Sequence, residues 1–251
     1  MAELHPLVTG FSDAEAYERG RHDYPQSVVQ ALAGALELSP VARILDLGAG
    51  TGKLSRALLA GGYDVIAVEP LASMREVLVG AIGAERVREG TAEAIPLADA
   101  STDAITCADS FHWFDERRAL AEMRRVLRPG GGVAILRAEP QLGAPWIEEL
   151  WEILVVHRGD HPGFAERPPG APLDEDPAFG PVSEQVITAQ DTSDRERILT
   201  WIATLSWIGR LPVARRREVL ERAEAVLERE HVTEIDYKVC FRMWTARLSG
   251  Q

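Results

Sequence analysis

The stretch that decides the fold is "ILDLGAGTGKL", Ile44 to Leu54, in which an apolar strand runs into a glycine-rich turn and then into a helix. Gly48, Gly50 and Gly52 carry no Cβ, so a bound molecule can approach the backbone of this turn closely. Turns of this kind bind several nucleotide-like ligands with different chemistries. The rest of the sequence has to decide between them.

Short apolar strands alternate with helical patterns around this turn. Such alternation is typical of βαβ units and a parallel sheet. We expect strands at 43–47, 64–69, 86–89, 103–108 and 132–138, and helices at 53–60, 72–79 and 116–127, the last of which is stopped by "RPGGG".

Amphipathic patterns before and after this core predict further elements. Two helices are expected at 12–20 and 25–36, the first of them capped by Ser12 or Asp13. Six prolines make 158–181 too proline-rich for a regular element, so we expect a long loop there. The remaining expected elements are helices at 144–157, 194–209 and 212–228 and strands at 184–191 and 235–246.

Length and composition favour one α/β domain. The 251 residues are 46% hydrophobic, enough for a full core, and contain no apolar run as long as a membrane helix needs. The N-terminal segment lacks the basic, apolar and small-residue order of a signal peptide. Cys107 and Cys240 are the only cysteines, which excludes a disulfide scaffold and a multi-cysteine metal site. We therefore expect a cytoplasmic protein without a metal site.

The charge of the chain argues against a nucleic-acid partner. Its net charge is −12, whereas proteins that bind phosphate backbones usually present a basic surface. The densest basic run, "ARRREVLER" (214–222), is interpreted as the solvent face of a helix, with Glu218 and Glu221 at pairing distance from its arginines. A small-molecule partner is favoured, and the sequence leaves a monomer and a homodimer open.

Two features near the glycine turn narrow the choice of ligand. The spacing is G-x-G-x-G after Asp46, unlike the G-x-G-x-x-G of dinucleotide folds, and no P-loop motif is present. Glu69 stands 21 residues beyond Gly48, at the end of the second expected strand. A carboxylate there can accept hydrogen bonds from both ribose hydroxyls, as in NAD and in S-adenosylmethionine sites. Both ligands therefore stay open at this point.

Several motifs, in order, carry a resemblance to a known family. They are Asp46-x-Gly48-x-Gly50-x-Gly52, "VEP" (68–70), "REGTAEAIPLADASTDAITCADSFHWFD" (88–115) and "MRRVLRPGGGVAIL" (123–136). Together they resemble class I S-adenosylmethionine-dependent methyltransferases of the type 11-like group. "FHWF" (111–114) and "FSDAEAYERGRHDYP" (11–25) are similar to its small-molecule branch, which includes trans-aconitate-type carboxyl methyltransferases. The resemblance implies an α/β, Rossmann-like fold: a seven-stranded, mostly parallel sheet flanked by helices, with the last strand antiparallel.

The resemblance also implies cofactor-binding roles for S-adenosylmethionine, whose product is S-adenosylhomocysteine. Asp46 and the turn backbone would hold the methionyl amino group, Glu69 the ribose, and Arg21 the methionyl carboxylate. The implied cofactor-binding residues are Tyr17, Arg21, Asp46, Gly48, Ala49, Gly50, Gly52, Glu69, Pro70, Met74, Thr91, Ala92, Glu93 and Ala108, with Leu71 beside Pro70 on the adenine face.

Structural roles compete with some of these assignments. Met74 also fits a helix core, and Glu93 also fits a helix cap or a surface acid. Arg21 also fits a solvated arginine, and Tyr17 and Tyr24 also fit contacts that fix the first helices to the sheet. Asp46 and Glu69 are poor core residues, so a functional role is favoured for both.

The acceptor side is expected to follow the fourth strand. His112 is the candidate general base, and its alternative is a structural histidine bonded to its own loop. Trp113, with Phe114, would form a wall for an apolar or aromatic acceptor, and Tyr24 would come from the N-terminal cover. Asp109 departs from the residues usual in the resembling branch, so we expect it to select an acceptor with a positive or hydrogen-bond-donating group.

Two groups of residues later in the chain are interpreted as structural. His157, Arg158, Asp160 and His161 lie in a Gly/Pro-rich loop without helical spacing, which favours a solvated surface cluster over a metal site. The helically spaced tryptophans are expected to pack helices together rather than to form an aromatic cage. They are Trp146, Trp151, Trp201 and Trp207.

The sequence thus predicts a methyltransferase of a small organic acceptor, methylated at O, N or C. The alternatives are a protein that binds S-adenosylmethionine without transferring its methyl group, as a sensor or cyclase-type protein, and an NAD-dependent oxidoreductase. We expect a single domain over 1–251. Its parts are a helical cover at 1–40, a cofactor-binding core at 41–140, a helical inset and mobile lid at 144–181, and the C-terminal part of the sheet with its helices at 182–251.

Overall fold

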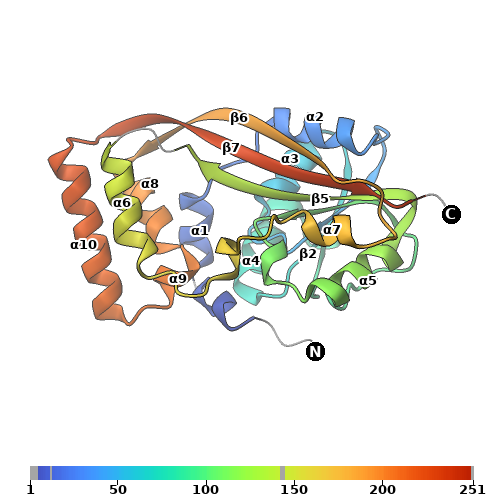
Figure 1. Cartoon of the computed structure of the whole chain (residues 1–251), viewed down its shortest axis with the longest axis horizontal. Coiled ribbons are helices and arrows are strands. Elements are labelled where there is room, and N and C mark those ends of the chain that lie inside the picture. The colour runs from blue at the N-terminus through green and yellow to red at the C-terminus, as the bar shows by residue number, and fades with distance from the viewer. Residues whose placement is uncertain (1–4, 12, 142–144, 250–251) are drawn as a thin grey trace.

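A computed structural model describes residues 5–11, 13–141 and 145–249. Its centre is a seven-stranded sheet in the order β3-β2-β1-β4-β5-β7-β6 (Figure 1). The strands are β1 (Arg43–Leu47), β2 (Asp64–Val68), β3 (Val87–Arg88), β4 (Thr102–Ala108), β5 (Leu127–Pro140), β6 (Ser183–Asp194) and β7 (Glu234–Arg247).

All strands except β7 run in the same direction. β1 pairs parallel with β2 and β4, and β4 pairs parallel with β5, whereas β7 is antiparallel to both of its neighbours. The expected Rossmann-like sheet with an antiparallel last strand is therefore confirmed. The strand order reverses between β1 and β4, where open α/β sheets form their ligand crevice.

Helices cover both faces of the sheet and extend beyond it. The helices are α1 (Ala14–Gly20), α2 (Gln26–Ala35), α3 (Lys53–Ala60), α4 (Ala72–Ile82), α5 (Glu116–Val126), α6 (Pro145–Val155), α7 (Ala171–Glu175), α8 (Arg195–Ala203), α9 (Ser206–Gly209) and α10 (Val213–Arg229). Short 3-10 turns occupy Pro6–Gly10, Ala84–Arg86, Phe111–Trp113 and Pro162–Phe164. Among the described residues, no helix is long and apolar enough to cross a membrane.

The core has two layers because β1, β2, β4 and β5 are apolar on both sides, as parallel strands between helices require. Val28 and Leu32 of α2 and Leu58 of α3 pack on one face of the sheet. Leu120 and Met123 of α5 pack on the other face. At roughly 25 cal/mol per Å² of apolar surface, these layers supply most of the free energy that holds the sheet in place.

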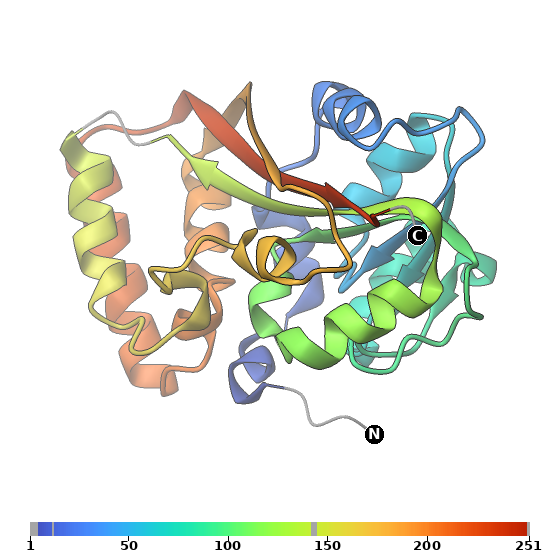
Figure 2. The ribbon, with the colours of Figure 1, turned by 45° about the vertical axis from the view of Figure 1, so that its right-hand side comes forward.

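A third cluster lies beside the sheet, where α6, α8, α9 and α10 pack together (Figures 1 and 2). We call these four helices the cap. Leu150 and Leu154 of α6 meet Ile202 of α8 and Ala223 and Leu227 of α10 in its interior. The cap therefore combines the expected helical inset with helices from the range 182–251. It reaches the sheet through β5, β6 and β7, whose long ribbons extend toward it (Figure 1).

Local details differ from the sequence prediction at three places, one of which is the helix expected over 194–209, since it is interrupted after Ala203 and forms α8 and α9. β5 begins at Leu127 instead of 132, because Leu127 already pairs with Thr102 and "RPGGG" forms an irregular part of the strand, with a positive φ at Gly130. The proline-rich segment is not wholly irregular, since it contains the 3-10 turn Pro162–Phe164 and the short helix α7. Asp13 caps α1 by accepting a hydrogen bond from the Ala16 N–H (2.8 Å), while the alternative cap, Ser12, lies outside the described residues.

Candidate active site

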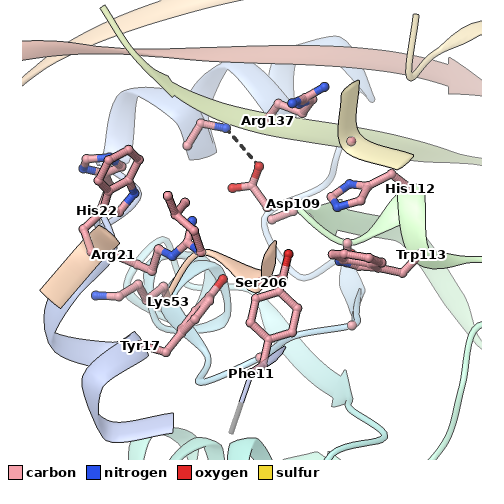
Figure 3. A pocket seen from close by; sticks show the side chains of 18 of the residues that line it. Phe11, Tyr17, Arg21, His22, Lys53, Asp109, His112, Trp113, Arg137 and Ser206 are labelled. Carbon is pink, nitrogen blue, oxygen red and sulfur yellow. Dashed lines mark hydrogen bonds between the residues drawn. The ribbon is translucent and has the colours of Figure 1, made fainter. Parts of the chain in front are cut away.

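A cavity of about 700 Å³ opens at the carboxyl ends of the central strands and continues under the cap. One end begins at the glycine turn after β1 and at Glu69 after β2. The other end lies past β4, between the N-terminal segment and the cap (Figure 3). Every residue that the sequence analysis assigned to a cofactor or to an acceptor lines this cavity, except Gly52.

The three glycines of the turn all have positive φ, which L-residues rarely adopt. A Cβ on Gly48 would lie 2.7 Å from the Ser110 Cβ, and a Cβ on Gly52 would lie 2.6 Å from the Leu78 Cδ1. A Cβ on Gly50 would instead face the cavity, with the Tyr17 Cε1 as its nearest neighbour at 3.9 Å. Gly48 and Gly52 therefore serve close packing, while Gly50 leaves space for a ligand.

Asp46 is the last residue but one of β1 and is 1% exposed. Both of its carboxylate oxygens accept hydrogen bonds, from the Ser55 hydroxyl (2.6 Å) and from the Thr106 hydroxyl (3.1 Å). Burial outweighs these bonds and raises the pKa of Asp46 to about 6. A cationic group placed beside it would favour the carboxylate and lower that pKa again.

Glu69, just after β2, connects two segments of backbone. Its Oε2 accepts a hydrogen bond from the Gly50 N–H (2.8 Å), and its Oε1 accepts one from the Leu71 N–H (2.9 Å). Burial raises the pKa of Glu69 while these two bonds lower it. Each oxygen keeps a lone pair, so the carboxylate can still accept hydrogen bonds from a ligand.

The side of the cavity assigned to adenine is largely apolar. Met74 of α4 is 3% exposed and packs inside the molecule, as its alternative core role also predicts. Thr91 keeps a buried hydroxyl that has no hydrogen-bond partner within the described structure. Glu93 lines the cavity and also accepts a hydrogen bond from the Asp115 N–H (2.9 Å) just before α5. Glu93 therefore combines a loop-fixing contact with a place in the cavity wall.

The N-terminal segment covers the cavity with Tyr17 and Arg21 (Figure 3). The Arg21 guanidinium lies 4.8 Å from the centre of the Tyr17 ring and donates to the Thr204 carbonyl (2.9 Å). Its Nε is buried, with no partner among the described residues. His22 next to it bonds to Asp191 (2.9 Å) and joins the cover to β6.

Asp109 follows β4 with a φ of +51°, a strained conformation for a residue with a side chain. The Tyr24 hydroxyl donates to its Oδ2 (3.2 Å), and the Ala138 N–H donates to its Oδ1 (3.3 Å; Figure 3). Burial raises the pKa of Asp109. The side chain is partly exposed, toward the cavity, and is placed to accept a hydrogen bond there.

His112 lies in the 3-10 turn after β4, and its ring packs 4.5 Å from that of Trp113. Burial lowers the pKa of His112 to about 3, so the ring is neutral near pH 7. No hydrogen bond joins it to another residue in the described part of the chain, so the expected alternative of a bond to its own loop is not realised. A ring of such low pKa is a weak base, but it can accept a hydrogen bond from a ligand.

His161 departs from the sequence prediction of a solvated surface cluster. It is 6% exposed, bonds through Nε2 to the Ser206 hydroxyl (2.8 Å), and accepts from the Gly163 N–H through Nδ1 (3.0 Å). Its ring lies 5.6 Å from that of His112 across the cavity wall. Only Arg158 and Asp160 of the predicted cluster are exposed. Sequence alone gave no signal for the contact, because Ser206 is distant in the chain.

The four helically spaced tryptophans both pack helices together and line the cavity, whereas the sequence predicted only the packing. Trp146, Trp201 and Trp207 pack against the apolar interior of the cap, as expected. All three and Trp151 also line the cavity, which the prediction of pure helix packing missed. Arg137 of β5 lines it as well and was not assigned.

The low pKa of His161 makes stability depend on pH. Burial lowers this pKa from 6.5 to about 4, so the unfolded chain binds the proton first as the pH falls. The contribution of the neutral ring to the free energy of unfolding is complete above about pH 6.5 and is lost as the pH falls toward about 4. From about pH 7.5 to about pH 5, we expect the free energy of unfolding to fall by about 1–2 kcal/mol more in the unmodified protein than in His161→Gln.

Urea denaturation at both pH values measures this difference. Each variant is compared with itself, which removes the pH-independent cost of losing the Ser206 contact. The same pH dependence in both proteins would contradict the burial of a neutral ring at this position.

Comparison with known proteins agrees with this geometry. Residues 45–135 match a family described as a methyltransferase domain. This match, the relatives named as methyltransferases and the shared fold identify residues 45–135 as a class I methyltransferase domain, and this fold implies S-adenosylmethionine as methyl donor.

Among its relatives, an uncharacterized methyltransferase of Mycobacterium tuberculosis is 45% identical over 141 residues, 55% of this chain and 56% of that protein. The match spans little more than half of that relative's length. A solved candidate methyltransferase from an antibiotic biosynthesis pathway of Anabaena variabilis is 25% identical, with a TM-score of 0.61 over 89% of this chain and 98% of that one. A candidate type II methyltransferase of Anaeromyxobacter dehalogenans shares the fold, at 24% identity and a TM-score of 0.62 over 92% and 99% of the two chains.

Proposed function

We propose that this protein transfers the methyl group of S-adenosylmethionine to a small organic acceptor. The observation that carries the proposal is the continuity of the cavity. One end meets the glycine turn and Glu69, and the other meets a wall of aromatic side chains past β4. A donor at the first end and an acceptor at the second would meet in one continuous cavity at the end of β4.

Features at the first end fit S-adenosylmethionine. Gly50 leaves open the space that a Cβ would fill, and the buried Thr51 and Thr91 hydroxyls and the Arg21 Nε lack partners within the described residues. A nucleoside with a charged tail would supply such partners. The proposed cofactor-binding residues are those that the sequence analysis named, with Asp46 toward the ammonium group, Glu69 toward the ribose and Arg21 toward the carboxylate.

When bound, the cofactor supplies an already activated methyl group, so the chain needs no nucleophile of its own. Its residues would hold the acceptor atom in line with that group and keep water away. Ala108, at the end of β4, lines the cavity between the two ends. Asp109 would accept a hydrogen bond from a hydroxyl or amine acceptor and receive its proton, a role that its raised pKa favours over the weakly basic His112.

The proposed organisation is a single domain in which the cap and the N-terminal cover enclose the acceptor. The cover at 1–40 contributes Tyr17 and Tyr24, and the segment 144–181 contributes α6 and His161 as parts of a lid. The acceptor is a small molecule, since the site is a cavity of about 700 Å³ and the chain has a net charge of −12.

Calorimetry and an acceptor screen test the proposal together. We expect S-adenosylmethionine to bind and NADH not to bind, and S-adenosylhomocysteine to be released with at least one class of hydroxyl, amine or carboxylate acceptor. Binding without release for any acceptor would favour a sensor. Absence of binding would refute the proposal. In the same screen, Asp109→Ala should change the acceptor preference and leave cofactor affinity unchanged, and an unchanged preference would remove Asp109 from the acceptor site.

A further inference from the structure

Arg137 is the arginine of the cavity whose guanidinium lacks hydrogen bonds within the described residues. It lies on β5, one residue beyond Leu136, which pairs with Ala108 at the end of β4. Arg137 therefore stands level with Asp109, the residue that follows the neighbouring strand β4, at the acceptor end of the cavity (Figure 3). Its nearest carboxylate is that of Glu139, 3.7 Å from its Nε, and both side chains are partly exposed.

The other arginines nearby differ from Arg137, because their guanidinium groups already have hydrogen-bond partners. The Arg21 guanidinium donates to the Thr204 carbonyl, and Arg242, opposite Arg137 on β7, pairs with Glu184. Five donors in a planar fork match the two oxygens of a carboxylate. The terminal nitrogens of Arg137 keep these donors available, and its positive charge contributes to the low pKa of His112 and His161 across the cavity.

Aromatic side chains line the same cavity on the cap side. Five of the six tryptophans of the chain line the cavity, joined by Phe11 and Phe164. Their rings are partly exposed, toward the cavity, and two of them lie edge-on to the His161 ring, at 4.8 Å for Trp113 and 5.0 Å for Trp207. Trp207 also has a buried Nε1 without a partner in the described part of the chain. Walls of this kind favour a planar ring over a flexible polar molecule.

We propose that the acceptor is an aromatic carboxylic acid, whose carboxylate is bound by Arg137 and whose ring lies among the cavity-lining tryptophans. This inference rests on the proposed function and names the substrate class of the same site. Arg137 anchors one end of the acceptor, and Asp109, just after the adjacent strand β4, serves as a hydrogen-bond acceptor for it. A ring that carries a hydroxyl or amino group as well as the carboxylate satisfies both residues at once.

The test measures binding rather than turnover. Titration calorimetry in saturating S-adenosylhomocysteine compares 2-naphthoate with 2-naphthamide, which has the same shape but no charge. We expect the unmodified protein to bind the carboxylate at least about tenfold more tightly than the amide, the scale of a hydrogen bond to a charged group. Arg137→Leu and Arg137→Gln should bring the ratio of the two affinities close to one, and both should still bind the amide.

Arg242→Leu is the matched control, because Arg242 faces Arg137 across the β5–β7 pair but does not line the cavity. It should keep the preference for the carboxylate. Equal affinity for the two probes in the unmodified protein, a preference that survives in both Arg137 variants, or binding of neither probe would overturn the inference. Failure of S-adenosylhomocysteine itself to bind would instead refute the proposed function, so the two failures can be told apart.

Discussion

Replacing Glu69 with alanine is expected to weaken S-adenosylmethionine binding by roughly 1–3 kcal/mol, the usual scale for hydrogen bonds to a charged group. The structure gives two reasons for the loss. The carboxylate lies at the end of β2 where the ribose is proposed to bind, and it also holds the Gly50 and Leu71 N–H groups. Without this carboxylate, the glycine turn loses the hydrogen bond that holds the Gly50 N–H, and the site loses a contact with the ligand.

Calorimetry on Glu69→Ala measures the change, and thermal melting without ligand shows how much of it comes from a loosened turn. Glu89→Ala is the control, since Glu89 lies near the same sheet edge, pairs with Arg75 (2.9 Å) and does not line the cavity. Its cofactor affinity should stay unchanged. An unaltered affinity in Glu69→Ala would place the nucleoside elsewhere and remove the main support for the proposed function.

The sheet and the turn could be predicted from sequence because their signals are local. Each of these central strands is a run of five to seven mostly apolar residues followed by a turn or a polar residue. The glycines and Asp46 lie within seven positions of one another, so their spacing carries the geometry of the turn directly. The family motifs then add Glu69 and the segment after β4, whose places follow from the parallel order of the strands.

The acceptor end of the cavity could not be predicted in the same way, because distant segments build it. A helically repeated tryptophan marks a buried face, but periodicity does not say whether that face meets a core or a cavity. Trp146 of α6 and Trp201 of α8 meet both, since their helices pack together at one end of the sheet. His161 was assigned to solvent because its partner, Ser206, lies 45 residues away.

The position of Arg137 in the sequence also indicates a functional role, which was not predicted. Arg137 follows the buried run Val133–Leu136 of β5, and it is aligned with Asp109 once β4 and β5 are paired. A charged residue at the carboxyl end of a central parallel strand stands where ligands of such sheets bind. The same argument that favoured function for Asp46 and Glu69 therefore extends to Arg137.

Replacing Gly52 of the glycine turn with alanine is expected to destabilise the protein far more than the same change at the exposed Gly62. In Gly52→Ala the new Cβ would lie 2.6 Å from the Leu78 Cδ1, and Leu78 is fully buried in α4. The φ of +92° adds the strain of a left-handed residue, about 1–2 kcal/mol, to an overpacking cost of about 1–3 kcal/mol. We therefore expect a loss of about 2–5 kcal/mol in the free energy of unfolding, measured by urea denaturation.

Gly62 separates the two contributions, because its φ is +91° and a Cβ there would meet nothing within 4 Å. Gly62→Ala should lose only the conformational part, about 1–2 kcal/mol. The difference between the two variants then measures how firmly α4 is held against the start of α3. If Gly52→Ala cost no more than Gly62→Ala, α4 would be free to shift, and the wall that carries Met74 would not be a rigid part of the cavity.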